Sequence, residues 1–270
     1  MTEATGTTDG AGTTDGAGTT DGAGTAGETA VAGTAGTAAA PGPVRRARVI
    51  ACATVIEELR PLLPPQIDPV VLDFGLHTRP AALRAALQEA VDAATDVDVV
   101  LLGYGMCSRA VIGVRAGSAT LVMPRVHDCI AIFLGSHGAY TDQVRREPGT
   151  YYLTKGWIAV GDSPFEQVRR LSQRHGEARA RRMVGLMLRH YTRLAFIRTG
   201  SYREEEFADY ARRAAEEFGL RFEEIDGAPD LIRKLVDGPW DDEVVVVRPG
   251  EVVTAQMFAQ PVPAQTRRPA

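Results

Sequence analysis

The sequence predicts an α/β protein built around a mostly parallel sheet, for three reasons. Short apolar runs rich in valine, isoleucine and leucine recur between residues 48 and 248. Segments with a helical spacing of apolar residues separate these runs, which favours crossover connections between parallel strands. The 270 residues are 44% apolar and 24% charged, as in a globular protein with an ordinary core. We therefore expect two Rossmann-like halves, or one doubly wound sheet with a helical insertion.

The expected strands are apolar, β-branched runs bounded by glycine, proline or polar residues. They are residues 48–53, 70–76, 97–105, 119–126, 194–198, 221–225 and 243–248.

The expected helices lie between these runs. Pro80 opens the clearest one, in which Leu83, Leu87 and Val91 recur every four residues and form a single apolar stripe. The expected helices are residues 55–63, 80–94, 164–191, 204–218 and 230–236, and a short apolar helix is expected to begin at Cys129.

Low-complexity ends flank the predicted α/β domain, which covers residues 47–256. The chain starts with GTTDGA repeats that contain no aromatic residue, so we expect a disordered tail over residues 1–46. Residues 257–270 are rich in proline and predict a second flexible tail. Within the domain, the possible halves are residues 47–160 and 190–256.

Composition narrows the classes of protein to which the chain can belong. Three cysteines are an odd number and too few for a disulfide framework, and no secretory signal is visible. The apolar runs fall short of the roughly 20 residues that a transmembrane helix needs. A net charge of −4 argues against a general nucleic-acid-binding protein. We therefore expect a cytoplasmic protein that binds neither membranes nor nucleic acids, and no feature indicates its oligomeric state.

The three cysteines each lie where an expected strand ends. Cys52 closes the first strand, Cys107 follows the third, and His127 and Cys129 follow the fourth. Ligands of open α/β sheets bind at the carboxyl ends of the strands, so these side chains are expected to share one site. Thiolates together with an imidazole favour zinc, with another transition metal such as iron or cobalt as the alternative. The sequence therefore predicts a metal centre with Cys52, Cys107, His127 and Cys129 as ligands.

Alternation along the chain refines this prediction. Residues two apart on an extended segment face the same side, so His127 and Cys129 are expected to bind one ion while Asp128 faces away. Two other interpretations stay open. The cysteines, Cys52 above all, could be small core residues. Alternatively, Cys129 could be a metal-free nucleophile at a helix N-terminus, with His127 as its base.

Residues around the cysteines suggest the rest of a ligand site. Gly103 and Gly105 allow the backbone to approach a cofactor closely, and Arg109 could bind an anionic group on it. His77 is the candidate acid or base, although it could instead cap the helix that follows. Trp157 could form a wall or lid over the site, or anchor the core.

Several segments of the chain resemble a known family. They are RPAALRAALQEA, LLGYGMCSRAVIGVRAGSATLVMPRVHDCIAIFLGS and GTYYLTKGWI. They are similar to the bacterial and archaeal domain-of-unknown-function family 1638, and the resemblance covers residues 49–254. The family's signatures stand here as Cys52, His77, the turn of residues 103–107 and the triplet His127-Asp128-Cys129. The resemblance implies no activity by itself, but members are often encoded near corrinoid proteins and corrinoid-dependent methyltransferases.

The sequence thus predicts a zinc-thiolate α/β protein of methyl-group or corrinoid-linked one-carbon metabolism. It would be a methyltransferase-type enzyme acting on a small molecule, with a corrinoid protein as a possible partner and a corrinoid cofactor implied by association only. Its HxC pair has the form found in thiol-using cobamide methyltransferases, which is an analogy. The alternatives are a non-enzymatic metal-binding accessory protein of such a system, and a metal-free small-molecule binder.

Overall fold

The computed structural model describes residues 46–259 except 66, 68, 108, 162, 201 and 202, and its architecture is α/β, which confirms the predicted fold class. The two predicted tails lie outside the described residues, apart from residues 46 and 257–259. No helix in the described ranges is long and apolar enough to cross a membrane.

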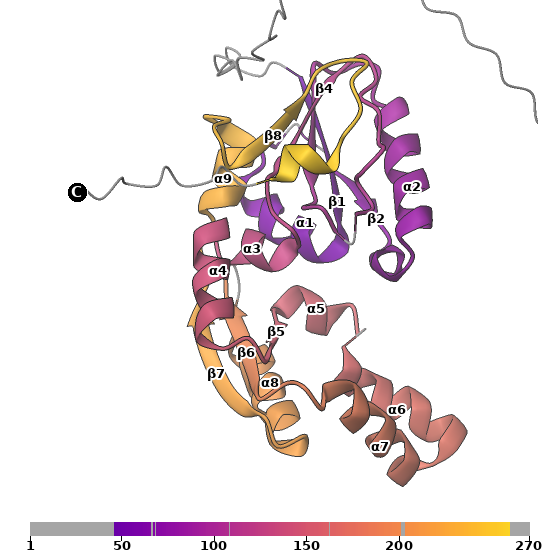
Figure 1. Cartoon of the computed structure of the whole chain (residues 1–270), viewed down its shortest axis with the longest axis vertical. Helices are drawn as coiled ribbons and strands as arrows, with labels where there is room; N and C mark the ends of the chain where they lie inside the picture. The colour runs from indigo at the N-terminus through magenta and orange to yellow at the C-terminus, as the bar shows by residue number, and fades with distance from the viewer. Residues whose placement is uncertain are drawn as a thin grey trace, which may run out of the picture. The chain divides into compact units, whose positions relative to one another are not determined.

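The first sheet has five strands in the order β2-β1-β3-β4-β8 (Figure 1). Its strands are β1 (Ala47–Cys52), β2 (Val70–Leu72), β3 (Val99–Gly103), β4 (Thr120–Pro124) and β8 (Val244–Val247). The first four are parallel, and β8 pairs antiparallel with β4 at the edge. Every residue of β3 is buried, as a central strand covered on both faces requires. The carboxyl ends of β1, β3 and β4 therefore meet at one edge.

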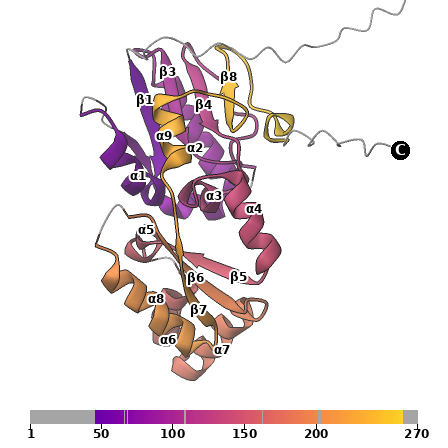
Figure 2. The same ribbon diagram turned by 90° about the vertical axis from the view of Figure 1, so that its left-hand side faces the viewer.

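The second sheet has three parallel strands, in the order β5-β6-β7 (Figure 2). They are β5 (Thr150–Leu153), β6 (Arg193–Arg198) and β7 (Arg221–Asp226). The sequence did not predict β5, because its four residues include two tyrosines and no β-branched aliphatic run. The chain returns to the first sheet only with β8.

Nine α-helices and three 3-10 helices lie in the described part of the chain. The α-helices are α1 (Ala53–Leu59), α2 (Pro80–Asp92), α3 (Cys129–Phe133), α4 (His137–Arg146), α5 (Lys155–Ala159), α6 (Pro164–His175), α7 (Glu177–Leu188), α8 (Glu205–Glu217) and α9 (Asp230–Asp237). The 3-10 helices are η1 (Arg60–Leu62), η2 (Phe74–Thr78) and η3 (Ala255–Phe258).

Two sequence predictions were wrong in their boundaries. The single helix expected over residues 164–191 is a pair, α6 and α7, because Gly176 between them has a φ of 74° that interrupts helical geometry. The strand expected over residues 70–76 ends at Leu72. There the Asp73 carboxylate accepts a hydrogen bond from the Gly75 backbone N–H and starts η2 instead. The other predicted elements are present, with ends shifted by a few residues.

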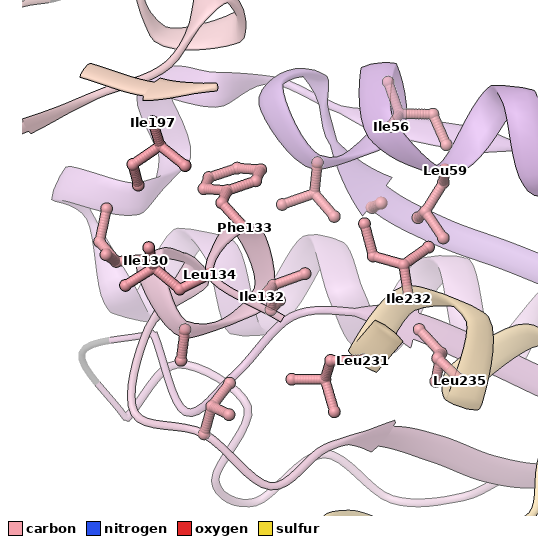
Figure 3. Packing of buried hydrophobic residues seen from close by; sticks show 14 of the residues in the cluster. Ile56, Leu59, Ile130, Ile132, Phe133, Leu134, Ile197, Leu231, Ile232 and Leu235 are labelled. Carbon is pink, nitrogen blue, oxygen red and sulfur yellow. The ribbon is translucent and has the colours of Figure 1, made fainter. Parts of the chain in front are cut away.

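Side chains that alternate along β1 bury the two faces of the first sheet in different clusters. Val49 and Ala51 face a cluster that contains apolar residues of α1, α3 and α9, and Figure 3 shows Ile56, Phe133 and Leu231 from these helices. The opposite face packs against the apolar stripe of α2 predicted from the sequence. Apolar residues of α6, α7 and α8 form a third cluster on the second sheet. Helices thus cover the first sheet on both faces and leave its carboxyl edge to loops.

Candidate functional site

A cavity of about 180 Å³ lies at the carboxyl edge of the first sheet. The residues that line it come from the ends of β1 and β3, from the loop after β3, from η2 and the residue before it, from the start of α3, and from α1, α2 and α5. They are Cys52, Thr54, Asp73, Phe74, His77, Leu83, Gly103, Tyr104, Cys107, Asp128, Cys129, Ile130 and Trp157. The cavity is smaller than the roughly 300 to 1,000 Å³ of sites for drug-sized molecules, so it suits a ligand of few atoms.

The structure brings all three cysteines into this pocket. Cys52 is the last residue of β1, Cys107 lies in the loop after β3, and Cys129 is the first residue of α3. They are separated by up to 77 positions in the sequence (129 − 52), yet each lines the same cavity. All three are free thiols.

Backbone hydrogen bonds join the loops that carry Cys107 and Cys129. The Met106 N–H donates to the Val126 carbonyl (2.8 Å), and the Cys107 N–H donates to the His127 carbonyl (2.9 Å). This close approach needs a glycine, because a Cβ on Gly105 would lie 2.7 Å from the Val126 carbonyl oxygen. Cys107 itself adopts a φ of 44°, in the left-handed region that most residues avoid. The two loops therefore form one unit that fixes the position of the Cys107 thiol.

The thiols of Cys107 and Cys129 keep their protons at neutral pH when no metal is bound. Burial raises the pKa of Cys107 to about 12, and the neighbouring Cys52 and Asp128 add to the shift. Burial, followed by Cys52 and Cys107, also raises the pKa of Cys129 well above its ordinary value. These shifts argue against a metal-free thiolate nucleophile at Cys129, since α3 does not overcome the cost of burying the charge.

Asp128 and His127 lie the other way round from the expected alternation. Asp128 lines the pocket, where its carboxylate accepts hydrogen bonds from the Ile130 N–H (2.9 Å) and from the Tyr140 hydroxyl (3.3 Å). His127 is not among the residues that line the cavity, and its ring lies 6.0 Å from that of His137. The expected alternation assumed that residues 127–129 are all extended, but Cys129 is already the first residue of α3. Asp128 is the N-cap of α3, so the helix, and not a strand, sets the direction of Cys129.

His137 borders a second cavity of about 190 Å³, together with Arg125 and Glu243. Burial and the nearby His127 lower the pKa of His137. His127 thus neighbours the histidine of this second cavity and does not line the cavity of the cysteines.

His77 lines the cysteine pocket from η2. Its Nδ1 lies 2.6 Å from the Phe74 carbonyl oxygen, and its ring centroid lies 4.3 Å from that of Phe74. A carbonyl oxygen can only accept a hydrogen bond, so Nδ1 carries the proton that is donated to it. In the neutral ring, the other nitrogen, Nε2, then has no proton and is the one that can act as a base. This arrangement suits an acid, a base or a metal ligand.

The three residues predicted to bind a cofactor divide between the pocket and its surroundings. Gly103 lines the pocket, and a Cβ there would lie 2.7 Å from the Cβ of Ala51 on β1, so the glycine allows β1 and β3 to pack closely. Gly105 shapes the loop, as described above. Arg109 is exposed, has a φ of 68° and is not among the lining residues.

Sequence reasoning missed most of the aromatic and acidic wall of the pocket. Phe74, Tyr104 and Asp73 were not singled out, whereas Trp157 was suggested as a wall and does line the cavity. The Tyr104 hydroxyl and the Trp157 Nε1 are buried and have no hydrogen-bond partner among the described residues. Burial also raises the pKa of Tyr104 strongly, so this phenol stays a hydrogen-bond donor. The sequence placed Asp73 and Tyr104 inside expected strands (70–76 and 97–105), whereas in the structure they follow β2 and β3, so their position gave no signal.

The chemistry of the donors fits a soft metal ion, because three thiols border one small cavity. Their arrangement is not that of a formed metal shell. Among the described residues, no group of three or more His, Cys, Asp or Glu side chains is already placed to hold a metal ion. Binding a metal at the pocket would therefore require side-chain rotation as well as loss of the thiol protons.

Comparison with known proteins gives one match. A family model described as a protein of unknown function (DUF1638) matches residues 71–236, which is more than half of the chain. No curated protein and no solved structure matches the chain significantly.

Proposed function

Because the chain belongs to the DUF1638 family, whose function is unknown, we propose a function from the pocket itself: a zinc-thiolate centre that acts on a small molecule in methyl-group metabolism. The observation that carries this proposal is the convergence of Cys52, Cys107 and Cys129 on one cavity. Three thiolates on one ion leave a fourth position, and in catalytic zinc sites that position is exchangeable.

The raised pKa values of the thiols are compatible with metal binding, but they lower the affinity because the metal must displace tightly held protons. A zinc ion replaces the protons of its thiol ligands, so binding must overcome the pKa of Cys107, about 12, and the raised pKa of Cys129. In return, the bound metal supplies the charge that stabilises thiolates in a buried site. The pocket therefore favours an ion of high thiolate affinity over magnesium or calcium.

His77 is the residue proposed to move protons at this centre. It lines the same cavity, and its Nε2 is the nitrogen left unprotonated by the contact of Nδ1 with the Phe74 carbonyl. A substrate thiol or water that enters the pocket would transfer its proton to this nitrogen. His77 could also take the fourth metal position, in which case the centre would be closed.

The link to methyl transfer rests on the association of the family with corrinoid methyltransferases. A corrin ring is far larger than the cavity of about 180 Å³. A corrinoid would therefore have to be presented by a partner protein, with only its methyl group or the substrate reaching the thiols. A non-enzymatic accessory role in the same system would use the same metal site without the exchangeable position.

A metal-free small-molecule binder is the second candidate. It is favoured by the raised pKa of Cys107 and Cys129, which keeps both side chains neutral and lets them serve as part of an ordinary pocket wall.

Metal analysis of the full chain, purified without oxygen after growth with added zinc, separates these candidates. We expect about one zinc per chain and a shell of sulfur with one nitrogen or oxygen by X-ray absorption. Cys52→Ser, Cys107→Ser and Cys129→Ser should each lower the zinc content, whereas His127→Asn serves as the matched control and should not. Protein that stays metal-free, or cysteine variants with unchanged zinc, would overturn the proposal and leave the metal-free binder.

A further inference from the structure

The pocket has an acidic and aromatic lining. Asp73 and Asp128 contribute carboxylates, and Phe74, Tyr104 and Trp157 contribute aromatic rings. None of the described residues that line the cavity is a lysine or an arginine. The lining thus contains two carboxylates and, among the described residues, one basic side chain, that of His77.

We propose that this pocket binds a small methylated cation, namely a quaternary ammonium group, next to the thiols. The inference deepens the proposed function by naming a ligand class for the same site. A quaternary ammonium group has no N–H to donate, so it is recognised by aromatic faces and by nearby fixed negative charge. Both features are present here on separate elements of the fold.

The aromatic part of the site is held in place by packing between α1 and α5. Gly156 lies so close to α1 that a Cβ on it would be 3.1 Å from Thr54 Cα, and Lys155 forms an ion pair with Glu57 of α1 (2.8 Å). These contacts place Trp157 at the cavity. Its ring centroid is 6.0 Å from that of Phe74, with the planes at 65°. Two rings at this angle form a corner, and the preference of cations for aromatic faces makes such a corner a suitable wall.

The carboxylates are fixed rather than mobile. The Asp73 carboxylate accepts from the Gly75 N–H (2.9 Å), and the Asp128 carboxylate is held by the Ile130 N–H and the Tyr140 hydroxyl. Hydrogen bonds of this kind orient a carboxylate without neutralising it. Both residues line the cavity, so a cation that binds there without N–H groups gains from the electrostatic field of the carboxylates and needs no direct hydrogen bond.

The unpartnered Tyr104 hydroxyl suggests a further feature of the ligand. This buried donor has no acceptor among the described residues, and leaving such a group unsatisfied costs free energy. A ligand oxygen close to the ammonium group would accept from it. Choline, which carries a hydroxyl two carbons from its trimethylammonium group, is therefore a suitable probe.

The test compares choline with its uncharged isostere, in which a tert-butyl group replaces the trimethylammonium group. Calorimetric titration of the full chain, with and without zinc, should show choline binding at least about tenfold more tightly, because only the cation gains from the rings and carboxylates. Trp157→Leu should reduce this preference by up to about 30-fold, and Trp157→Phe should restore part of it. Asp73→Asn, which keeps the side-chain shape, should weaken choline and leave the isostere unchanged. Asp237→Asn removes an exposed carboxylate at the end of α9 and is the matched control.

Equal affinity for choline and the isostere, or tighter binding of acetate than of choline, would overturn the inference. The outcome is distinguishable from failure of the metal centre, because zinc content is measured on the same samples. Protein that holds zinc but shows no cation preference loses only the ligand class. Protein that lacks zinc but keeps the preference loses only the metal centre.

Discussion

The two sheets of the protein bury ionisable groups in opposite ways. In the second sheet, Arg193 is only 3% exposed and its guanidinium donates to Glu223, Thr150 and Gln143. At the edge of the first sheet, no lysine or arginine is among the described residues that line the cavity with Cys107 and Cys129, and burial keeps these two thiols neutral. A buried charge must be paired, whereas a thiol can be buried alone as a neutral group. The buried charge of Arg193 in the second sheet is thus already paired, whereas the thiol pocket at the edge of the first sheet is proposed to bind a cation.

Removing Arg193 should produce the largest loss of stability and sharpen this contrast. Arg193→Ala removes a buried guanidinium together with its hydrogen bonds to Glu223, Thr150 and Gln143. A hydrogen bond to a charged group contributes about 1.5–3 kcal/mol, and less at Glu223, whose side chain is 37% exposed. Urea denaturation followed by circular dichroism would measure the loss. Arg221→Ala is the matched control, since this arginine also pairs with Glu223 but is about half exposed, and exposed pairs contribute about 0–1 kcal/mol. If both variants lost a similar free energy of unfolding, the greater importance assigned to the buried Arg193 over the exposed Arg221 would be wrong.

Replacing Gly105 should disturb the first sheet's edge and spare the second sheet. In Gly105→Ala, the new Cβ meets the Val126 carbonyl at 2.7 Å, which should cost about 1–3 kcal/mol and separate the loops of Cys107 and Cys129. Zinc affinity should fall together with stability. In Gly185→Ala on α7, the new Cβ meets nothing within 4 Å. This control should stabilise the protein by up to about 1 kcal/mol, because alanine favours a helix more than glycine does. Unchanged zinc binding in Gly105→Ala would show that the two loops do not act as one unit.

Raising the pH should destabilise the metal-free protein through the first sheet's thiols. A thiol with a raised pKa in the folded state keeps its proton while the unfolded chain loses it. This contribution is therefore fully present below the ordinary pKa of 9.0 and is lost as the pH rises toward the folded value of about 12. Cys107 alone should account for about 1.4 kcal/mol per pH unit in this window. Denaturation curves at pH 8 and about pH 10 would measure the loss, and Cys107→Ser should show a smaller one. A pH dependence unaffected by the substitution would place its origin elsewhere.

Most strands and helices could be predicted, because they depend on the order of apolar and polar residues along short segments of the sequence. The β-branched runs gave seven of the eight strands, and the stripe of Leu83, Leu87 and Val91 gave α2 and the face it buries. The division into two sheets could not be predicted. It depends on which strands pair, and the short strand β5 has a composition that does not distinguish it from a loop.

The candidate site could likewise be predicted only in part. The position of the cysteines at strand ends was readable, because parallel strands bring their carboxyl ends to one edge. The exchange of roles between His127 and Asp128 was not, because it depends on Asp128 capping α3, where its carboxylate accepts a hydrogen bond from the Ile130 N–H. Trp157 is placed at the pocket by contacts between α5 and α1, such as that of Gly156 with Thr54, two residues 102 positions apart (156 − 54). Such contacts leave no periodic signal in the sequence.

The short helix α3 has a consequence for how the pocket could be observed. It begins at Cys129, and the carbonyl of its last residue, Phe133, accepts a hydrogen bond from the Ala228 N–H (3.1 Å), just beyond β7. Gly227 is packed so tightly there that a Cβ would lie 2.5 Å from the same carbonyl oxygen, and its own N–H donates to Arg198 at the end of β6 (2.7 Å). A helix of little more than one turn cannot rotate at one end and stay still at the other. The amide of Ala228 is thus a built-in reporter, and its rate of hydrogen exchange would register the filling of a pocket to which it contributes no atom.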